Sequence, residues 1–312
     1  MVTVVKKNNN EVTIVTAYFD IGRSSFAGYE RGNNKYINFF KFWARIKNNV
    51  VIYTQKIFKD EIEQIRADFG LKDRTKIIVV DDIYKLEPVI YKRMCELEKN
   101  SVYQEFRYQK NNIDSTAKYD YLMFLKNWCL KDAKDKGYIK TNFAAWLDFG
   151  FNHGGTTFID PKDFDFLWEY PFDEKIYIYG INKDEGLPIF KIVQSGEVYV
   201  SGAPYIVPVS LMDEFYSLIL ESLNSLLDVG LLDDDQTYLL MSYRKRKDLF
   251  HYDVLGWNML IHKYGGKCLK IKDLSKDKMK FKDKLLYKYR VRKRNKRYLK
   301  SVKKIFLKDY LD

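Results

Sequence analysis

The sequence has few of the residues that build disulfide frameworks or metal clusters. Its 312 residues include only three cysteines and three histidines. The cysteines, Cys95, Cys129 and Cys268, are widely separated and odd in number. They form neither a zinc-ligand spacing nor a disulfide framework, which is typical of a protein in a reducing cytoplasm.

Long apolar runs are also absent. No stretch approaches the roughly 20 apolar residues that a helix needs to cross a bilayer. The first residues, Met1 to Asn10, are polar and lack the apolar centre of a signal peptide. We therefore expect a cytoplasmic protein without a membrane-spanning helix.

The motifs of several common enzyme classes are missing as well. There is no Gly-x-x-x-x-Gly-Lys-Ser/Thr phosphate loop, no Gly-x-Ser-x-Gly nucleophile elbow and no Gly-x-Gly-x-x-Gly after the first apolar segment. The triplet Asp148-Phe149-Gly150 matches the metal-binding triplet of protein kinases, but the glycine-rich and His-Arg-Asp loops of a kinase are not found upstream. These absences argue against a P-loop enzyme, an α/β-hydrolase, a nicotinamide enzyme and a kinase.

The chain does contain ample apolar residues and an uneven distribution of charge. It is 46% hydrophobic, with 21 Phe, 25 Tyr and 5 Trp, which is enough for a sizeable core in one large domain. The net charge is +12, yet residues 270–312 hold 18 Lys and Arg against 5 Asp, a net charge of +13. The basic character is therefore local, and the body of the chain is near neutral.

This basic tail, residues 269–312, mixes basic and apolar residues. Leu299, Val302, Ile305 and Phe306 recur at helical spacing, which predicts a helix with one apolar and one Lys/Arg-rich face. Three roles fit: binding to an anionic membrane surface, packing on the body of the protein, and binding to nucleic acid. We favour the membrane surface and rank nucleic acid last.

Apolar patterns along the body predict alternating strands and helices. Unbroken β-branched or aromatic runs indicate buried strands, and apolar residues at helical spacing indicate helices between them. This alternation predicts an α/β fold with a mainly parallel central sheet flanked by helices. Strands are expected at residues 12–20, 50–54, 75–80, 143–147, 176–179 and 189–193. Helices are expected at residues 36–46, 59–69, 88–98, 118–136, 209–228 and 237–243.

Polar side chains follow the predicted strands at what should be one edge of the sheet. Residues 16–23, Asp81 with Asp82, and Asp148 all fall there. Open α/β sheets bind ligands at the carboxyl ends of their parallel strands. A carboxylate at Asp148 can bind a divalent cation, and the cation can hold a diphosphate. The alternative is that Asp148 caps the next element or opens a turn.

Five further positions carry candidate chemistry, each with a plainer alternative. Arg23 and Lys126 could contact a phosphate, or could be structural. Residues 233–236 (Asp-Asp-Asp-Gln) open a predicted helix, where one carboxylate could be a general base or orient an acceptor hydroxyl, or all could be solvated. His251 and His262 could complete the shell of a cation held by one carboxylate, or could be packed residues.

Two stretches resemble a known family. Residues 13–23, Thr-Ile-Val-Thr-Ala-Tyr-Phe-Asp-Ile-Gly-Arg, and residues 146–150, Trp-Leu-Asp-Phe-Gly, are similar to the HtrL/YibB family of bacterial glycosyltransferase-like proteins. Similar proteins occur in surface-polysaccharide loci. The resemblance covers roughly residues 12–261, which is most of the chain except the basic tail.

The resemblance implies how the chain is divided. We expect a single GT-A-like catalytic domain over residues 1–268. Its nucleotide-binding half would span about residues 1–150, and its acceptor half about residues 151–268. Residues 269–312 would be a basic helical extension of that domain.

The resemblance also implies roles for individual residues. Asp148 would stand at the first position of the Asp-x-Asp metal motif, although Gly150 occupies the second, so that His251 would complete the metal site. Asp235 and Gln236 would be the catalytic pair near the acceptor. Contacts to the donor are expected from Ala17, Tyr18, Phe19, Asp20, Arg23, Lys126 and Asp148.

The function that the resemblance implies is a metal-assisted glycosyltransferase. It would move a sugar from a nucleotide-sugar donor, a UDP-sugar, to a glycan or lipid-linked acceptor in capsule or lipo-oligosaccharide assembly, with Mn²⁺ or Mg²⁺. The tail would hold it peripherally on the inner face of the bacterial inner membrane. The alternative is a non-catalytic protein that binds a membrane surface or nucleic acid through the basic tail.

Overall fold

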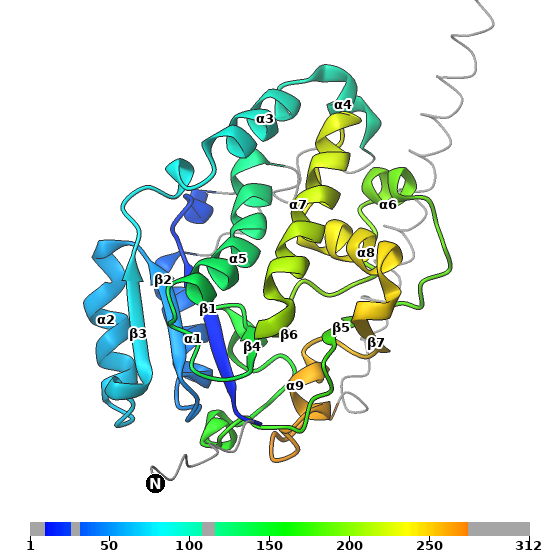
Figure 1. Ribbon diagram of the computed structural model, residues 1–312. Helices are drawn as coiled ribbons and strands as arrows, with labels where there is room; N and C mark the ends of the chain where they lie inside the picture. Colours follow the sequence, from blue (N-terminus) through cyan, green and yellow to red (C-terminus); the bar gives the residue numbers. More distant parts are fainter. Residues whose placement is uncertain (1–9, 26–31, 108–115, 274–312) are drawn as a thin grey trace, which may run out of the picture.

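The computed structural model describes residues 10–25, 32–107 and 116–273 (Figure 1). Residues 274–312, most of the basic tail, lie outside the described residues, so the roles suggested for that tail stay predictions. None of the helices in the described part combines the length and the apolar character that crossing a membrane requires.

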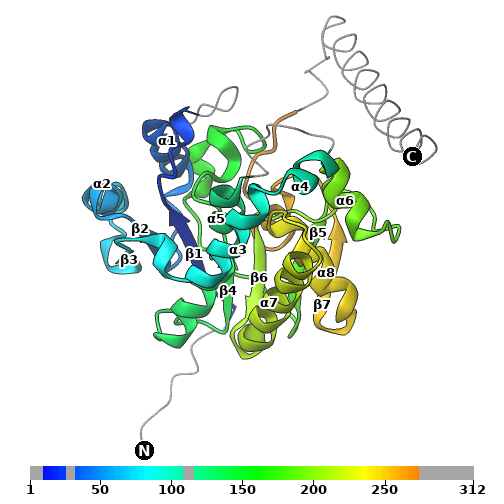
Figure 2. The ribbon, with the colours of Figure 1, turned by 90° about the horizontal axis from the view of Figure 1, so that it is seen from above.

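The central feature is a sheet that combines strands from both halves of the chain. Its order is β3-β2-β1-β4-β6-β5-β7, and every neighbouring pair is parallel except the two that β6 makes with β4 and β5. Figure 2 shows β3 with α2 at one end of the sheet and β7 at the other. The strands are β1 (Val12–Tyr18), β2 (Val50–Thr54), β3 (Thr75–Val79), β4 (Phe143–Trp146), β5 (Ile176–Gly180), β6 (Tyr205–Pro208) and β7 (Phe250–Val254).

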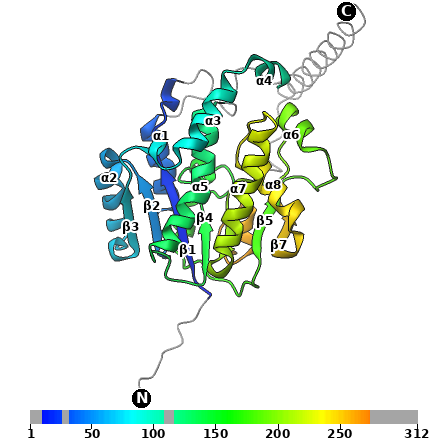
Figure 3. The same cartoon turned by 45° about the horizontal axis from the view of Figure 1, so that its top comes forward.

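Helices cover both faces of this sheet. One apolar cluster joins it to α3, α5, α7 and α8, which lie in front of the strands in Figure 3, and a second joins the other face to α1, α2 and α9. The expected fold class, α/β with a mainly parallel central sheet flanked by helices, is confirmed. The helices are α1 (Asn33–Trp43), α2 (Lys56–Ala67), α3 (Pro88–Glu98), α4 (Ser101–Phe106), α5 (Ala117–Asp135), α6 (Ile189–Ser195), α7 (Met212–Asp228), α8 (Asp235–Lys245) and α9 (Met259–Lys263).

The two central strands are buried because their sequences are apolar on both faces. Six of the seven residues of β1 and all four of β4 are buried. Strands covered by helices on both sides need this continuous apolar pattern rather than alternation. Their carboxyl ends lie at one edge of the sheet, as the sequence predicted, because β1 and β4 pair in parallel.

Short polar caps fix where the two helices nearest this edge begin. The Thr116 hydroxyl accepts a hydrogen bond from the Tyr119 N–H at the start of α5. The Asp234 carboxylate accepts one from the Gln236 N–H at the start of α8. Each cap satisfies a donor that the helix itself leaves unpaired.

One expected strand is wrong: residues 189–193 lie in helix α6. Five apolar or mixed residues cannot by themselves distinguish a short strand from a buried helical turn. The flanking residues decide it, because Pro188 precedes the helix and Gly196 ends it in the left-handed region at φ 62°. The Gly196 N–H donates to the Ile192 carbonyl, closing the last turn.

Candidate functional site

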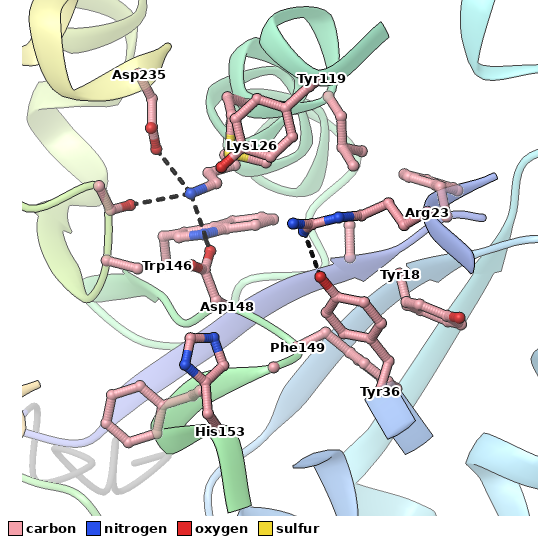
Figure 4. Close-up of a pocket in the computed structure, with 18 of the residues that line it drawn as sticks. Tyr18, Arg23, Tyr36, Tyr119, Lys126, Trp146, Asp148, Phe149, His153 and Asp235 are labelled. Carbon is pink, nitrogen blue, oxygen red and sulfur yellow. Dashed lines mark hydrogen bonds and ion pairs between the residues drawn. The ribbon is translucent and has the colours of Figure 1, made fainter. Parts of the chain in front are cut away.

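A cavity of ≈ 350 Å³ opens at the edge of the sheet where β1 and β4 end (Figure 4). Its walls come from the segments that follow these strands, from the middle of α5, from the loop before β6 and from the start of α8. This volume suits a small ligand. The cavity lies at the strand ends where the sequence predicted a binding site.

Most residues predicted for the site line this cavity. Asp82 is not among the lining residues, and its carboxylate caps a turn by accepting a hydrogen bond from the Tyr84 N–H at 3.0 Å. Neither Asp81 nor His251 is among them. Those that do line it are Ala17, Tyr18, Phe19, Asp20, Arg23, Lys126, Asp148, Asp235 and Gln236.

Lys126 is the central charge of the cavity. Its side chain is only 6% exposed, and its ammonium lies 3.0 Å from Asp148 Oδ1 and 2.7 Å from Asp235 Oδ2. It also donates to the Gly202 carbonyl at 3.3 Å. Burial by itself would lower the pKa of Lys126, but the two carboxylates outweigh it and raise that pKa. The lysine is therefore a permanent buried cation that joins α5, the end of β4 and the start of α8.

Asp235 is the deepest acid of the cavity. It is 1% exposed, and burial raises its pKa to about 6 even though Lys126 opposes this shift. Gly202 lies against it so closely that an added Cβ would sit 2.5 Å from Asp235 Oδ2. A side chain at residue 202 would displace the carboxylate, so glycine is required there. A buried carboxyl with a pKa near neutrality is typical of acid–base chemistry.

The other two acids of this cluster serve the structure. Asp233 pairs with the buried guanidinium of Arg107 at 3.3 Å and accepts a hydrogen bond from Thr237. Asp234 is the N-cap of α8. The cluster is thus no solvated helix start, since Asp233 and Asp235 are both buried. Only Asp235 of the three lines the cavity.

Asp148 is held at the end of β4 but stays open to the cavity. Its Oδ1 accepts a hydrogen bond from the Trp146 indole at 2.7 Å and pairs with Lys126. Its side chain remains 43% exposed. The next residue, Phe149, stacks on Tyr18 at 4.8 Å and on Phe40 at 4.5 Å, which anchors the segment.

Aromatic rings and one arginine form the opposite wall. The Arg23 guanidinium donates to the Tyr36 hydroxyl and lies over the rings of Tyr36 at 5.7 Å and Tyr119 at 5.4 Å (Figure 4). Nearby, the Tyr18 hydroxyl donates to Asn33, whose amide donates to Asp20. Such a wall offers a cation, flat rings and polar atoms to one ligand.

His251 is kept away from Asp148 by the order of the strands. The register aligns His251 of β7 with Tyr177 of β5, and through Ile206 of β6 with Ala145 of β4. Three strand spacings, about 14 Å, therefore separate it from β4. Its Nε2 lies 2.8 Å from the Tyr264 hydroxyl. The predicted pairing of His251 with Asp148 is thus not found.

The Tyr36 ring packs against Gly150, which stands at the second position of the Asp-x-Asp motif. A Cβ added at Gly150 would lie 3.1 Å from a Tyr36 ring carbon, and Tyr36 is held by Arg23. An aspartate at residue 150 would therefore need Tyr36 to move. This packing accounts for the glycine that departs from the motif.

With His251 distant and a glycine at residue 150, Asp148 is the only one of the predicted metal ligands that remains at the site. No group of three or more His, Cys, Asp or Glu side chains able to hold a metal occurs within residues 10–25, 32–107 and 116–273. The Trp146 indole and the Lys126 ammonium both contact Asp148 through Oδ1. The charged lining side chains Asp20, Arg23, Lys126, Asp148 and Asp235 together leave one net negative charge. One carboxylate with substrate phosphates and water is a common magnesium environment. Asp148 is therefore the residue that would hold a cation at this site, without His251.

Several lining residues were missed by the sequence analysis. Tyr36 and Tyr119 lie on α1 and α5, Trp257 and Asn258 lie before α9, and Trp146 lies within β4. Of these, only Trp146 belongs to a stretch that the sequence singled out, residues 146–150, and no role was predicted for it. The one local signal was the Trp146-to-Asp148 spacing, which puts the indole N–H within reach of the carboxylate.

The chain is similar to known proteins over most of its length. Residues 10–264 match the model of a family described as "Bacterial protein of unknown function (HtrL_YibB)". The chain is 31% identical over 264 residues to Protein HtrL of Escherichia coli (strain K12), covering 79% of this chain and 89% of that protein. Among solved structures, the apo form of mouse xyloside xylosyltransferase 1 matches with a TM-score of 0.42 and 11% identity, covering 77% of this chain and 84% of that one.

Proposed function

Because the chain belongs to the HtrL_YibB family of bacterial proteins, a family of unknown function, we propose its function from the chemistry of its own cavity. We propose that it is a glycosyltransferase of GT-A-like type. It transfers a sugar from a nucleotide-sugar donor, a UDP-sugar, to a surface-polysaccharide acceptor in the cytoplasm. The observation that carries the proposal is Asp235, a buried carboxyl with a pKa of about 6, paired with a buried lysine in a cavity at the strand ends.

The cavity offers complementary groups for each part of a nucleotide donor. The rings of Tyr36 and Tyr119 suit a flat base, and the guanidinium of Arg23 suits a phosphate. The polar atoms of Asn33 and Asp20 suit ribose hydroxyls. A divalent cation held by Asp148 and the diphosphate would neutralise the charge that builds on the leaving group.

The transfer itself needs a base beside the acceptor, and Asp235 is the candidate. The acceptor oxygen attacks the anomeric carbon of the donor sugar as the bond from that carbon to the diphosphate oxygen breaks. The nucleoside diphosphate leaves with the electron pair, and the acceptor hydroxyl proton passes to the Asp235 carboxylate. A pKa of about 6 leaves this group ionised at neutral pH yet basic enough to accept the proton. Gln236, the next lining residue, can orient the acceptor hydroxyl.

Binding of nucleoside diphosphates tests the proposal directly. The full chain is heated with UDP, GDP, ADP or CDP, each with and without Mg²⁺ or Mn²⁺, and its unfolding temperature is recorded. A shift with one of them, largest for UDP, is expected because a ligand that binds only the folded state stabilises it. If none of these mixtures shifts the transition, the glycosyltransferase proposal is refuted.

The alternative function rests on the charge of the tail. A net charge of +13 over residues 270–312 suits a protein that only binds an anionic membrane or nucleic acid. Deleting these residues separates the two functions. A glycosyltransferase lacking them still binds its nucleotide through the cavity, whereas a tail-dependent binding protein loses every partner.

A further inference from the structure

Trp257 is the exposed aromatic residue of the cavity. It is 49% exposed, while Trp43 and Trp168 are fully buried. Of the large apolar residues that are exposed within the described parts of the chain, it alone lines the cavity. A single exposed apolar residue is ordinary elsewhere on a surface. Beside a cavity that contains Asp235, an exposed indole is a flat apolar platform for a ligand.

The backbone that carries this indole is fixed. The next residue, Asn258, is in the left-handed region at φ 67°, and its N–H donates to the Tyr179 hydroxyl at 3.0 Å. Its side-chain amide donates to Thr157 at 3.0 Å. The Tyr179 hydroxyl in turn donates to the Ala203 carbonyl, in the loop that receives Lys126. A left-handed position held by two hydrogen bonds is typical of ligand-binding segments, and a fixed platform loses little entropy on binding.

Two amide side chains line the same cavity as Trp257. Gln236 and Asn258 both line the cavity, and Gln236 has no side-chain hydrogen bond among the described residues. Pyranose rings combine an apolar face of C–H groups with hydroxyls around the edge. An indole matches that face, and amide groups donate to and accept from those hydroxyls. An acyl chain or an isolated phosphate would use only part of this surface.

We propose that Trp257 is the platform on which the acceptor stacks, so that the acceptor presents a pyranose ring to the cavity. The inference rests on the proposed function and specifies its acceptor. It assigns Trp257 a binding role, with the sugar hydroxyl that reacts directed towards Asp235. The acceptor is then the end of a glycan, free or lipid-linked, rather than a protein side chain.

Saturation-transfer difference NMR on the full chain tests this contact. The probes are methyl β-glucopyranoside, methyl β-galactopyranoside and methyl α-mannopyranoside, each added with UDP and Mg²⁺. We expect saturation of the ring C–H protons for at least one probe, and affinity about tenfold weaker in Trp257→Ala. Trp257→Phe should retain part of the signal. Val254→Ala is the matched control, since Val254 is 54% exposed but outside the cavity lining.

The outcomes distinguish this inference from the proposed function. If UDP shifts the unfolding temperature of every variant but no probe gives a Trp257-dependent signal, the assignment of Trp257 as the acceptor platform is wrong. The glycosyltransferase proposal then still stands. If UDP does not bind while a pyranoside signal depends on Trp257, the sugar site stands and the donor assignment is wrong. Retained UDP binding by Trp257→Ala shows that this variant is folded.

Discussion

The ammonium of Lys126 lies 2.7 Å from Oδ2 of Asp235, and both side chains are almost completely buried. The partners come from the middle of α5 and the first residue of α8, more than a hundred residues apart in the sequence. A buried ion pair of this kind gives little net stability, but removing one partner leaves an uncompensated charge. The ion pair of Lys126 and Asp235 therefore affects both the stability of the fold and the ability of Asp235 to accept a proton.

Replacing Lys126 by Met should therefore destabilise the fold strongly. We expect a loss of about 3–5 kcal/mol in the free energy of unfolding, because two carboxylates lose their cation. Lys131→Met is the matched control on the same helix. Lys131 pairs with Asp135 and Asp213 near the surface, so its loss should cost no more than about 1 kcal/mol. Urea denaturation measures the free energy of unfolding of both variants. Equal losses would show that the burial of Lys126 between two carboxylates adds no cost to its removal.

Replacing Asp235 by Asn should abolish transfer without abolishing donor binding. The amide has the same shape but cannot accept the proton, so turnover should fall about 10²–10⁴-fold. Since the carboxylate is the active form and its pKa is about 6, wild-type turnover should decline as the pH falls through that value. Asp234→Asn is the control, because Asn also caps a helix. A wild-type rate that is flat between pH 5 and 8 would remove Asp235 as the base.

Replacing Asp148 by Asn should weaken the dependence of nucleotide binding on Mg²⁺. Asp148 is the cavity carboxylate whose contacts with Trp146 and Lys126 both use Oδ1, and an amide is a poorer ligand for a hard cation. His251→Ala should leave this dependence unchanged, because the strand register places His251 away from the cavity. Titration calorimetry of UDP with and without Mg²⁺ compares the two variants. If His251→Ala weakened the Mg²⁺ dependence more than Asp148→Asn, the result would support the metal pair of Asp148 and His251 that the resemblance implied.

Introducing an aspartate at residue 150, the second position of the Asp-x-Asp motif, should lower the stability of the fold and should not strengthen Mg²⁺-dependent binding of UDP. In Gly150→Asp the new side chain meets the Tyr36 ring 3.1 Å from its Cβ, so we expect a loss of about 1–3 kcal/mol in stability. Gly256→Asp is the matched control, since its nearest contact, Met259, lies at 3.5 Å. Thermal unfolding and the Mg²⁺ dependence of UDP binding are measured together. A stable Gly150→Asp variant with tighter metal-dependent binding would contradict the packing argument.

Local sequence signals predicted strands β1 to β5, the longer helices and part of the site. The apolar runs at residues 12–20 and 143–147 predicted the two central strands, which lie at Val12–Tyr18 and Phe143–Trp146, because a strand buried on both faces has no polar alternation. Asp148 was predicted at the site because it directly follows such a run. The acidic helix start at residues 233–236 was predicted from the sequence, but Asp235 was singled out within it only by the family resemblance. Residues 189–193 were misassigned because a five-residue apolar run carries no clear period.

The sequence by itself thus determined the fold class, strands β1 to β5 and the edge of the sheet where polar side chains gather, but it did not predict strands β6 and β7. Only the tertiary structure decided which side chains meet there. Insertion of β6 between β4 and β5 moved His251 away from Asp148, while packing of α5 against the sheet brought Lys126 between Asp148 and Asp235. Periodicity and capping depend on neighbours within a few residues, whereas these pairings depend on strand order and helix packing, which no local pattern records.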